Sequence, residues 1–164
     1  LEFVDDNGAL PGDVIGGIDF DSNTIIINSA IESHLGRYSF TIAHEIAHHV
    51  LHRDLFLKAR SGDSIMCRGV EVRPIEEVQA DRFAEALLMP ISTIVNNCKK
   101  ANGFIGYSRR RRLALAAKAI KLTGINNVSV SAMEMRLMHL GYLPPYNSNI
   151  RRTLKAVRAR FLGS

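Results

Sequence analysis

The sequence predicts an α+β fold in which a small antiparallel sheet precedes a group of helices, and three observations support this prediction. Residues 24–27 are a β-branched run, which is typical of a buried strand. Residues 41–52 contain no Gly or Pro and are rich in helix formers. Beyond residue 99, helical stretches alternate with glycine stops. With 164 residues, the chain can form one domain, or a domain with a small appendage.

Composition excludes several classes of protein. The hydrophobic fraction of 46% is ordinary for a globular protein, no apolar run reaches the length of a membrane span, and the first residues lack a signal-peptide pattern. Cys67 and Cys98 are too few for a disulfide framework, and neither has zinc-finger spacing to another Cys or His. We therefore expect free thiols and a cytoplasmic location.

Charge divides the chain into two parts. Residues 1–98 contain 7 Lys/Arg and 15 Asp/Glu, whereas residues 99–164 contain 14 Lys/Arg and one acid, Glu134. The resulting balances of −8 and +13 sum to the net charge of +5. This asymmetry predicts an acidic domain over 1–98 and a basic helical region over 99–164 that could contact nucleic acid or an acidic partner.

The first forty residues predict the sheet. Residues 1–12 are polar with Gly and Pro, and we expect an irregular segment there. Residues 13–28 predict a hairpin with its turn at Asp21-Ser22-Asn23. Residues 29–35 predict a short helical turn that Gly36 ends. Ser39 or Thr41 could then cap the following helix.

That helix contains the sequence His44-Glu45-Ile46-Ala47-His48, an H-E-x-x-H motif. Residues four apart lie on one face of a helix, so both imidazoles can reach one metal ion. Glu45 lies on the adjacent strip, within reach of a water held by that metal, and would act as a general base. This is the arrangement of a zinc hydrolase, although chance matches to so short a motif occur on ordinary amphipathic helices.

A third metal ligand must come from elsewhere. His52 is about 12 Å of helix away from His44, too far to share one zinc, so we expect it to flank the site or face solvent. Leu51 and Asp54 occupy the positions where metzincins need Gly and His. Residues 53–74 predict a long loop, for which a substrate-covering role is one interpretation. An acid from the next helix is the remaining source of the ligand.

The second helix is predicted over residues 74–89, with Pro74 at its first position and Pro90 as its stop. Glu77 and Asp81 lie one turn apart on one face. Glu77 is the best candidate for the third ligand, and Asp81 could accept a hydrogen bond from the far nitrogen of a ligating His. Glu76 is a weaker candidate, and an ordinary solvated acidic face is the alternative.

Three blocks of the sequence together resemble the ImmA/IrrE family of metallo-endopeptidases. Residues 26–28, 37–52 and 77–90 follow its patterns I-x-I-N, R-x-x-F-T-x-A-H-E-x-x-H-x-x-L-H and E-x-x-A-[ND]-x-F-A-x-x-L-L-M-P. Ala47 replaces the Gly that the family usually has before the second motif His. The resemblance implies a zincin-like domain, metal ligands His44, His48 and Glu77, and cleavage of helix-turn-helix transcriptional repressors that silence phage, mobile-element or stress-response genes.

The C-terminal region predicts helices over 113–122 and 132–140, ended by Gly124 and Gly141, after a basic run at 109–112. It resembles the helix-turn-helix-like segment that follows the peptidase block in this family. The second helix offers few polar side chains to read DNA, and its apolar residues look like core: Met133, Met135, Met138 and Leu140. We therefore favour packing or substrate docking over sequence-specific DNA binding. Residues 144–164 could form a basic amphipathic helix.

Two functions from different classes follow. The first is a zinc endopeptidase that uses His44, His48 and Glu77 as ligands, with another divalent metal such as Mn²⁺ as an alternative, and Glu45 as the base. The second is a regulator that binds DNA or a repressor without cleaving it, in which the metal is structural or vestigial. A complete ligand set together with Glu45 favours the enzyme.

Overall fold

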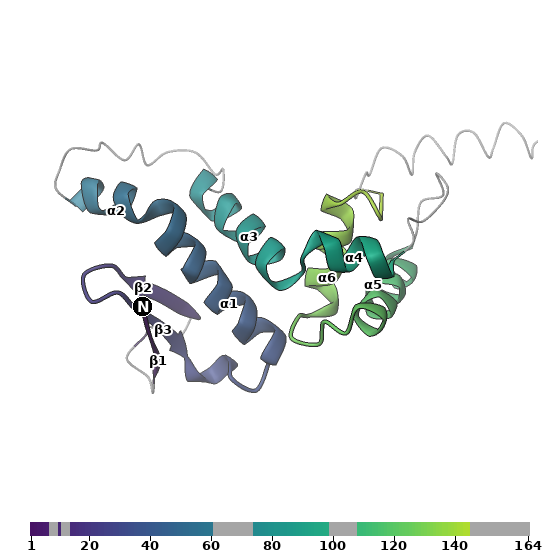
Figure 1. Cartoon of the computed structure of the whole chain (residues 1–164). Coiled ribbons are helices and arrows are strands. Elements are labelled where there is room, and N and C mark those ends of the chain that lie inside the picture. The colour runs from purple at the N-terminus through teal and green to yellow at the C-terminus, as the bar shows by residue number, and fades with distance from the viewer. Residues whose placement is uncertain (7–9, 11–13, 61–73, 99–107, 145–164) are drawn as a thin grey trace, which may run out of the picture. The chain divides into compact units, whose positions relative to one another are not determined.

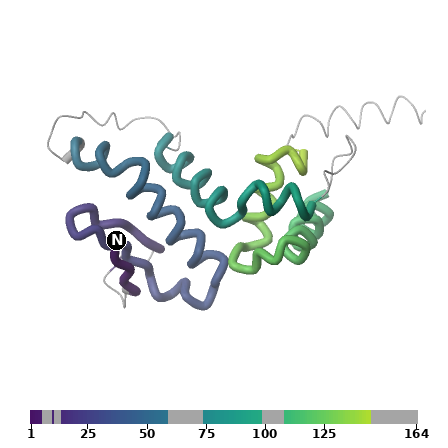
Figure 2. The backbone as a smooth tube through the Cα atoms, in the orientation of Figure 1, coloured from purple at the N-terminus to yellow at the C-terminus, as the bar shows by residue number. Residues whose placement is uncertain are grey.

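In a computed structural model of the protein, the described residues are 1–6, 10, 14–60, 74–98 and 108–144. The chain divides into two compact units (Figure 1; Figure 2). Unit 1 comprises Leu1–Ile91 together with Ile125–Ser129, and unit 2 comprises Ser92–Gly124 together with Val130–Ser164. No helix in the described ranges is both long and apolar enough to cross a membrane.

Unit 1 contains a three-stranded mixed sheet in the order β1-β3-β2. β1 (Glu2–Asp6) pairs parallel with β3 (Thr24–Asn28), and β2 (Gly16–Asp19) pairs antiparallel with it. The prediction of an antiparallel sheet was therefore wrong for β1, and so was the irregular segment over 1–12. The strand was missed because three of its five residues are acidic, and because parallel pairing leaves no local turn signal.

The predicted hairpin is confirmed as β2 and β3. The Asp19 carboxylate accepts hydrogen bonds from the Asp21 amide and the Ser22 hydroxyl, which stabilises the turn. Asn23 adopts a positive φ of 54°, a conformation that Asn tolerates better than most residues. β3 is enclosed by a strand on each side, so β1 and β2 form the edges of the sheet within the described residues.

One continuous helical run follows the sheet. After the 3₁₀ turn η1 (Ser29–Ile31), α1 spans Leu35–Ala47, a π-helical segment η2 spans His48–His52, and α2 spans Arg53–Arg60. The turn at η1 was predicted, but Gly36 lies inside the first turn of α1 instead of ending a helix. Neither Ser39 nor Thr41 caps α1, because the helix begins several residues earlier.

Two further predictions fail in this part of unit 1. The loop expected over 53–74 begins instead as α2, and residues 61–73 lie outside the described residues. Pro74 is the N-cap of α3 (Ile75–Leu88), one position before the predicted one. Exposed residues of α2 give it little apolar signal, which explains why its sequence was interpreted as a loop.

The core of unit 1 lies between the sheet and α1. Ile25, Ile27 and Ile31 are buried, and partly buried side chains of α1 pack against them. α1 also packs along α3, and both helices bury alanines, namely Ala43 and Ala47 on α1 and Ala80 and Ala84 on α3. Such small side chains allow two helix backbones to lie close together, which positions the functional groups of both helices.

Unit 2 consists of helices. α4 (Ile91–Asn97) was not predicted, whereas α5 (Arg109–Thr123) and α6 (Val130–His139) match the predicted pair. Gly124 and Gly141 have φ of 71° and 74° and end these helices as expected. Met133 is buried as predicted, but Met135 is 41% exposed and does not belong to the core. The tail predicted as a helix lies mostly outside the described residues.

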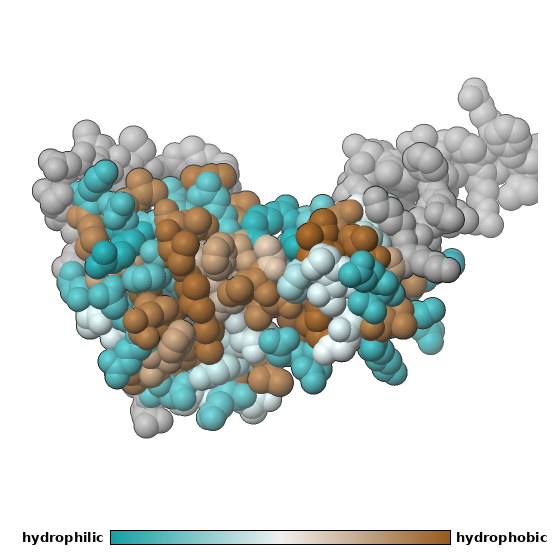
Figure 3. All heavy atoms as spheres, in the orientation of Figure 1, coloured by the Kyte–Doolittle hydropathy of each residue, from teal (hydrophilic) through white to brown (hydrophobic). Residues whose placement is uncertain are grey.

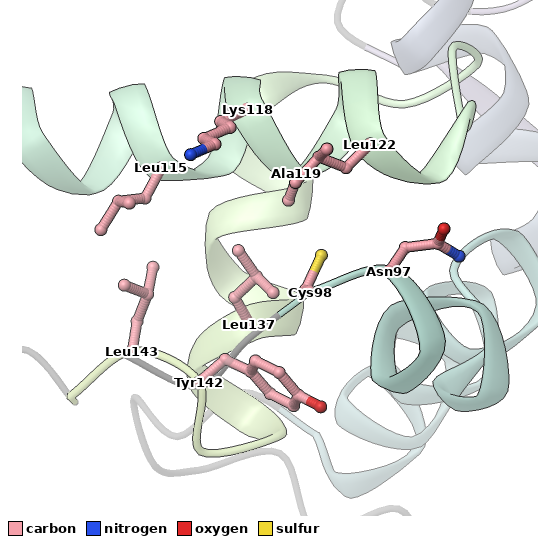
Figure 4. Close-up of a pocket in the computed structure, with 9 residues that line it drawn as sticks. All are labelled: Asn97, Cys98, Leu115, Lys118, Ala119, Leu122, Leu137, Tyr142 and Leu143. Atoms are coloured by element: carbon pink, nitrogen blue, oxygen red, sulfur yellow. The ribbon is translucent and has the colours of Figure 1, made fainter. Parts of the chain in front are cut away.

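A cavity of about 470 Å³ lies in unit 2 (Figure 4). Cys98, Leu115 and Leu137 line it, together with Asn97, Lys118, Ala119, Leu122, Tyr142 and Leu143. Cys98 is a free thiol, as predicted, and burial raises its pKa. Cys67 lies outside the described residues.

Candidate metal centre

Three side chains from α1, η2 and α3 converge on one point. His44 Nε2 lies 3.0 Å from His48 Nε2. The Glu77 carboxylate reaches both imidazoles, with one oxygen 3.3 Å from His44 Nε2 and the other 3.3 Å from His48 Nε2. The packing of α1 against α3 thus brings together two residues of the motif and an acid 29 positions beyond the second His.

This arrangement has the spacing of a cation site. Ligand atoms bound tetrahedrally to zinc, with bonds near 2.0–2.1 Å, lie about 3.3 Å apart. The three distances between donor atoms are close to that value. Imidazole nitrogens and a carboxylate are also the kinds of group that bind zinc in proteins. His44, His48 and Glu77 are therefore a set of residues that could hold a metal ion.

Asp81 lies behind His44, one helical turn beyond Glu77. Its carboxylate lies 3.0 Å from His44 Nδ1, so this nitrogen carries the proton and donates to Asp81. The lone pair of His44 is thereby directed from Nε2 toward Glu77 and His48. Asp81 occupies the position that the sequence predicted for a residue that orients a ligand.

Glu45 is adjacent to His44 on α1 and is not part of the converging set. Burial raises the pKa of its carboxyl; the nearby His44 lowers it, and the nearby Glu77 adds a smaller increase. Burial also lowers the pKa of His48, which favours the neutral imidazole that a metal requires, and the neighbouring His44 acts in the same direction. The site thus combines a His48 imidazole of lowered proton affinity with a Glu45 carboxylate of raised proton affinity.

A comparison with known families agrees with this geometry. Residues 7–100 match the peptidase family M78 model, described as the IrrE N-terminal-like domain. The chain belongs to the ImmA/IrrE family of metallopeptidases. No curated protein matches the chain significantly. The family match covers α1, η2 and α3 of the site and the strands β2 and β3, whereas β1 precedes the matched range.

Two groups of contacts around His48 involve residues that the family pattern given above does not specify. Gln79 on α3 contacts His52, which in turn contacts His48. Phe56 on α2 packs edge-on against the His48 ring with centroids 5.8 Å apart, and Phe20 stacks on Phe56 at 5.2 Å. Sequence reasoning missed both. Gln79 has no periodic or motif signal, and Phe56 stands in a segment that was predicted to be a loop.

His52 has a defined place in this ImmA/IrrE-type site. It is 1% exposed, so the expectation that it faces solvent is wrong and the alternative, that it flanks the site, holds. In the same unit, the Tyr38 hydroxyl donates a hydrogen bond to the Asp5 carboxylate at 2.9 Å. That hydrogen bond ties α1 to β1.

Proposed function

We propose that the protein is a zinc-dependent endopeptidase. The observation that carries this proposal is the convergence of His44 Nε2, His48 Nε2 and the Glu77 carboxylate at distances that suit one tetrahedral ion. Two imidazoles and one carboxylate, with a fourth position left for water, form a catalytic type of zinc set. Mn²⁺ is the alternative metal, because imidazole and carboxylate also bind it.

In the proposed mechanism, a bound Zn²⁺ would polarise the scissile carbonyl and acidify a water molecule. Glu45 accepts a proton from the attacking water and passes it to the leaving amine. The upward shift of its pKa suits this role, because a more basic carboxylate takes the proton of water more readily. Asp81 holds the His44 ring in the tautomer that leaves Nε2 available.

We propose a helix-turn-helix transcriptional repressor in the cytoplasm as the substrate. Family resemblance supports this class of substrate. An extended peptide could pair with an edge of the sheet, and the described edges are β1 and β2 because β3 is enclosed. Unit 1 also exposes large apolar side chains, including Leu51 and Val78, which a partly unfolded substrate could cover (Figure 3 shows one face).

The alternative is a regulator that binds nucleic acid or a repressor without cleavage. The balance of +13 over residues 99–164 favours it, as do Arg109 and Arg110, which are exposed at the start of α5. Their charges lie at the positive end of the helix dipole, where an anion would be stabilising. Under this alternative the metal would have only a structural role.

Incubation with purified helix-turn-helix repressors, including any encoded beside this gene, separates the two functions. Glu45→Gln should lower kcat by about 10²–10⁴-fold while zinc binding is retained, because only the proton acceptor is lost. Glu76→Gln is the matched control, since Glu76 neighbours Glu77 but is not in the converging set. Cleavage that survives Glu45→Gln would exclude the proposed base. Salt-dependent DNA binding without cleavage would favour the regulator.

A further inference from the structure

His48 has a support of its own, which differs from the one that holds His44. His52 lies behind His48, on the side away from Glu77, with its Nδ1 3.1 Å from His48 Nδ1. The other ring nitrogen of His52, Nε2, lies 3.0 Å from the Gln79 side-chain oxygen. His48, His52 and Gln79 thus form a chain of polar contacts that leads from the candidate metal centre to α3.

The π-helical segment provides this alignment. His48 and His52 are the first and last residues of η2, and their rings lie 5.1 Å apart between centroids. π-helical turns are rare and occur frequently at functional sites. Here the turn carries His48, which belongs to the converging set, and places His52 directly behind it.

The donor and acceptor roles at Gln79 determine which way the hydrogen bonds between His48, His52 and Gln79 run. An amide oxygen only accepts hydrogen bonds, so His52 Nε2 must carry the proton. The Nδ1 of a neutral His52 then has a lone pair and accepts from His48 Nδ1–H. His48 Nε2 is consequently free of a proton and faces His44 and Glu77. A donor in place of the Gln79 oxygen would reverse every bond and place a proton on His48 Nε2.

We propose that His52 and Gln79 are positioning residues that hold His48 in its Nδ1–H tautomer, so that its Nε2 can bind the metal. This inference rests on the proposed zinc site, but the tautomer itself can be tested without metal. The two imidazole ligands are then supported differently: a carboxylate contacts His44 directly, whereas a neutral amide acts on His48 through a second imidazole. Neither His52 nor Gln79 belongs to the converging set of His44, His48 and Glu77.

Gln79 is the position to change, because it is exposed whereas His52 is buried. Gln79→Met removes the acceptor at similar length, and Gln79→Glu keeps an acceptor. Val78→Met is the control on the same helix, because Val78 is 36% exposed and its side chain has no group that could form a hydrogen bond with a histidine. All variants are made in the full chain.

Two readouts test the inference. In the metal-free protein, long-range ¹H–¹⁵N correlation spectra of the imidazoles should show His48 as the Nδ1–H tautomer in the wild type, and a gain of Nε2–H in Gln79→Met. Competition with a chromophoric chelator should show zinc binding weakened about 10–100-fold in Gln79→Met. Gln79→Glu and Val78→Met should bind zinc within about threefold of the wild type.

Each adverse outcome has a distinct meaning. An unchanged His48 tautomer in Gln79→Met, or an equal loss of zinc affinity in Gln79→Met and Gln79→Glu, would overturn the proposed chain while leaving the zinc site intact. A wild-type protein that binds no zinc would instead overturn the proposed function. The tautomer measurement in the metal-free protein would still decide the role of Gln79 in that case.

Discussion

The two units bury polar groups in opposite ways. In unit 2, Arg112 of α5 and Glu134 of α6 are 3% and 7% exposed, and a 2.6 Å contact joins their opposite charges. In unit 1, the buried or partly buried polar groups of α1 and α3 instead direct lone pairs and a carboxylate toward one another. The comparison teaches that unit 2 uses a buried pair of opposite charges to join two helices, whereas unit 1 gathers polar groups that could hold a cation.

The largest effect is expected from breaking the pair in unit 2. Glu134→Ala leaves the Arg112 guanidinium buried without its carboxylate and should cost about 3–5 kcal/mol of unfolding free energy. Urea denaturation followed by circular dichroism measures the loss. The double variant Arg112→Met with Glu134→Leu should recover much of this loss, because it removes both charges of the pair. An equal loss in the single and double variants would show that the pair is not what fastens these helices.

A smaller effect is expected at the site in unit 1. Zinc at about 100 times its dissociation constant should raise the free energy of unfolding by about 2.7 kcal/mol, because it binds only the folded site. Glu77→Gln should abolish this gain yet change the metal-free stability by less than about 0.5 kcal/mol. Thermal unfolding with zinc and with chelator measures both. A zinc gain that persists in Glu77→Gln would place the ion elsewhere.

The last prediction concerns the loss of stability when a methyl group is added at Gly36, where residues 125–129 approach α1. A Cβ on Gly36 would lie 2.6 Å from the Ser129 backbone nitrogen and 2.8 Å from the Val128 carbonyl carbon. Gly36→Ala should therefore cost about 1–3 kcal/mol, because backbone must move to admit the methyl group. Gly17→Ala is the control, since nothing lies within 4 Å of its Cβ position. Equal stabilities in the two variants would contradict the close approach of residues 125–129 to α1.

Sequence reasoning predicted the parts of the molecule that have a local signal. The spacing of His44 and His48 on a helix, the acids on the following helix, the hairpin and the stops at Gly124 and Gly141 all follow from residue order, whereas the stop predicted at Gly36 was wrong. It did not predict β1, whose pairing with β3 joins residues about 22 positions apart without a turn. It also missed α2 and α4, which are short helices of mostly exposed residues.

Within the site, the contacts that cross between helices were the hardest to foresee. Glu77 and Asp81 were found because their spacing puts both on one face. Gln79 lies between them in the sequence, yet nothing in its context indicates that its side chain meets a histidine from η2. That contact depends on the π-helical turn and on how α1 packs against α3, neither of which is encoded in a local pattern.

The most direct test of the account is crystallographic. Crystals grown with zinc, measured on both sides of the zinc absorption edge, should show one anomalous peak about 2 Å from His44 Nε2, His48 Nε2 and a Glu77 oxygen. A peak at other residues, or none in protein saturated with zinc, would contradict the claim that these three side chains form the metal centre.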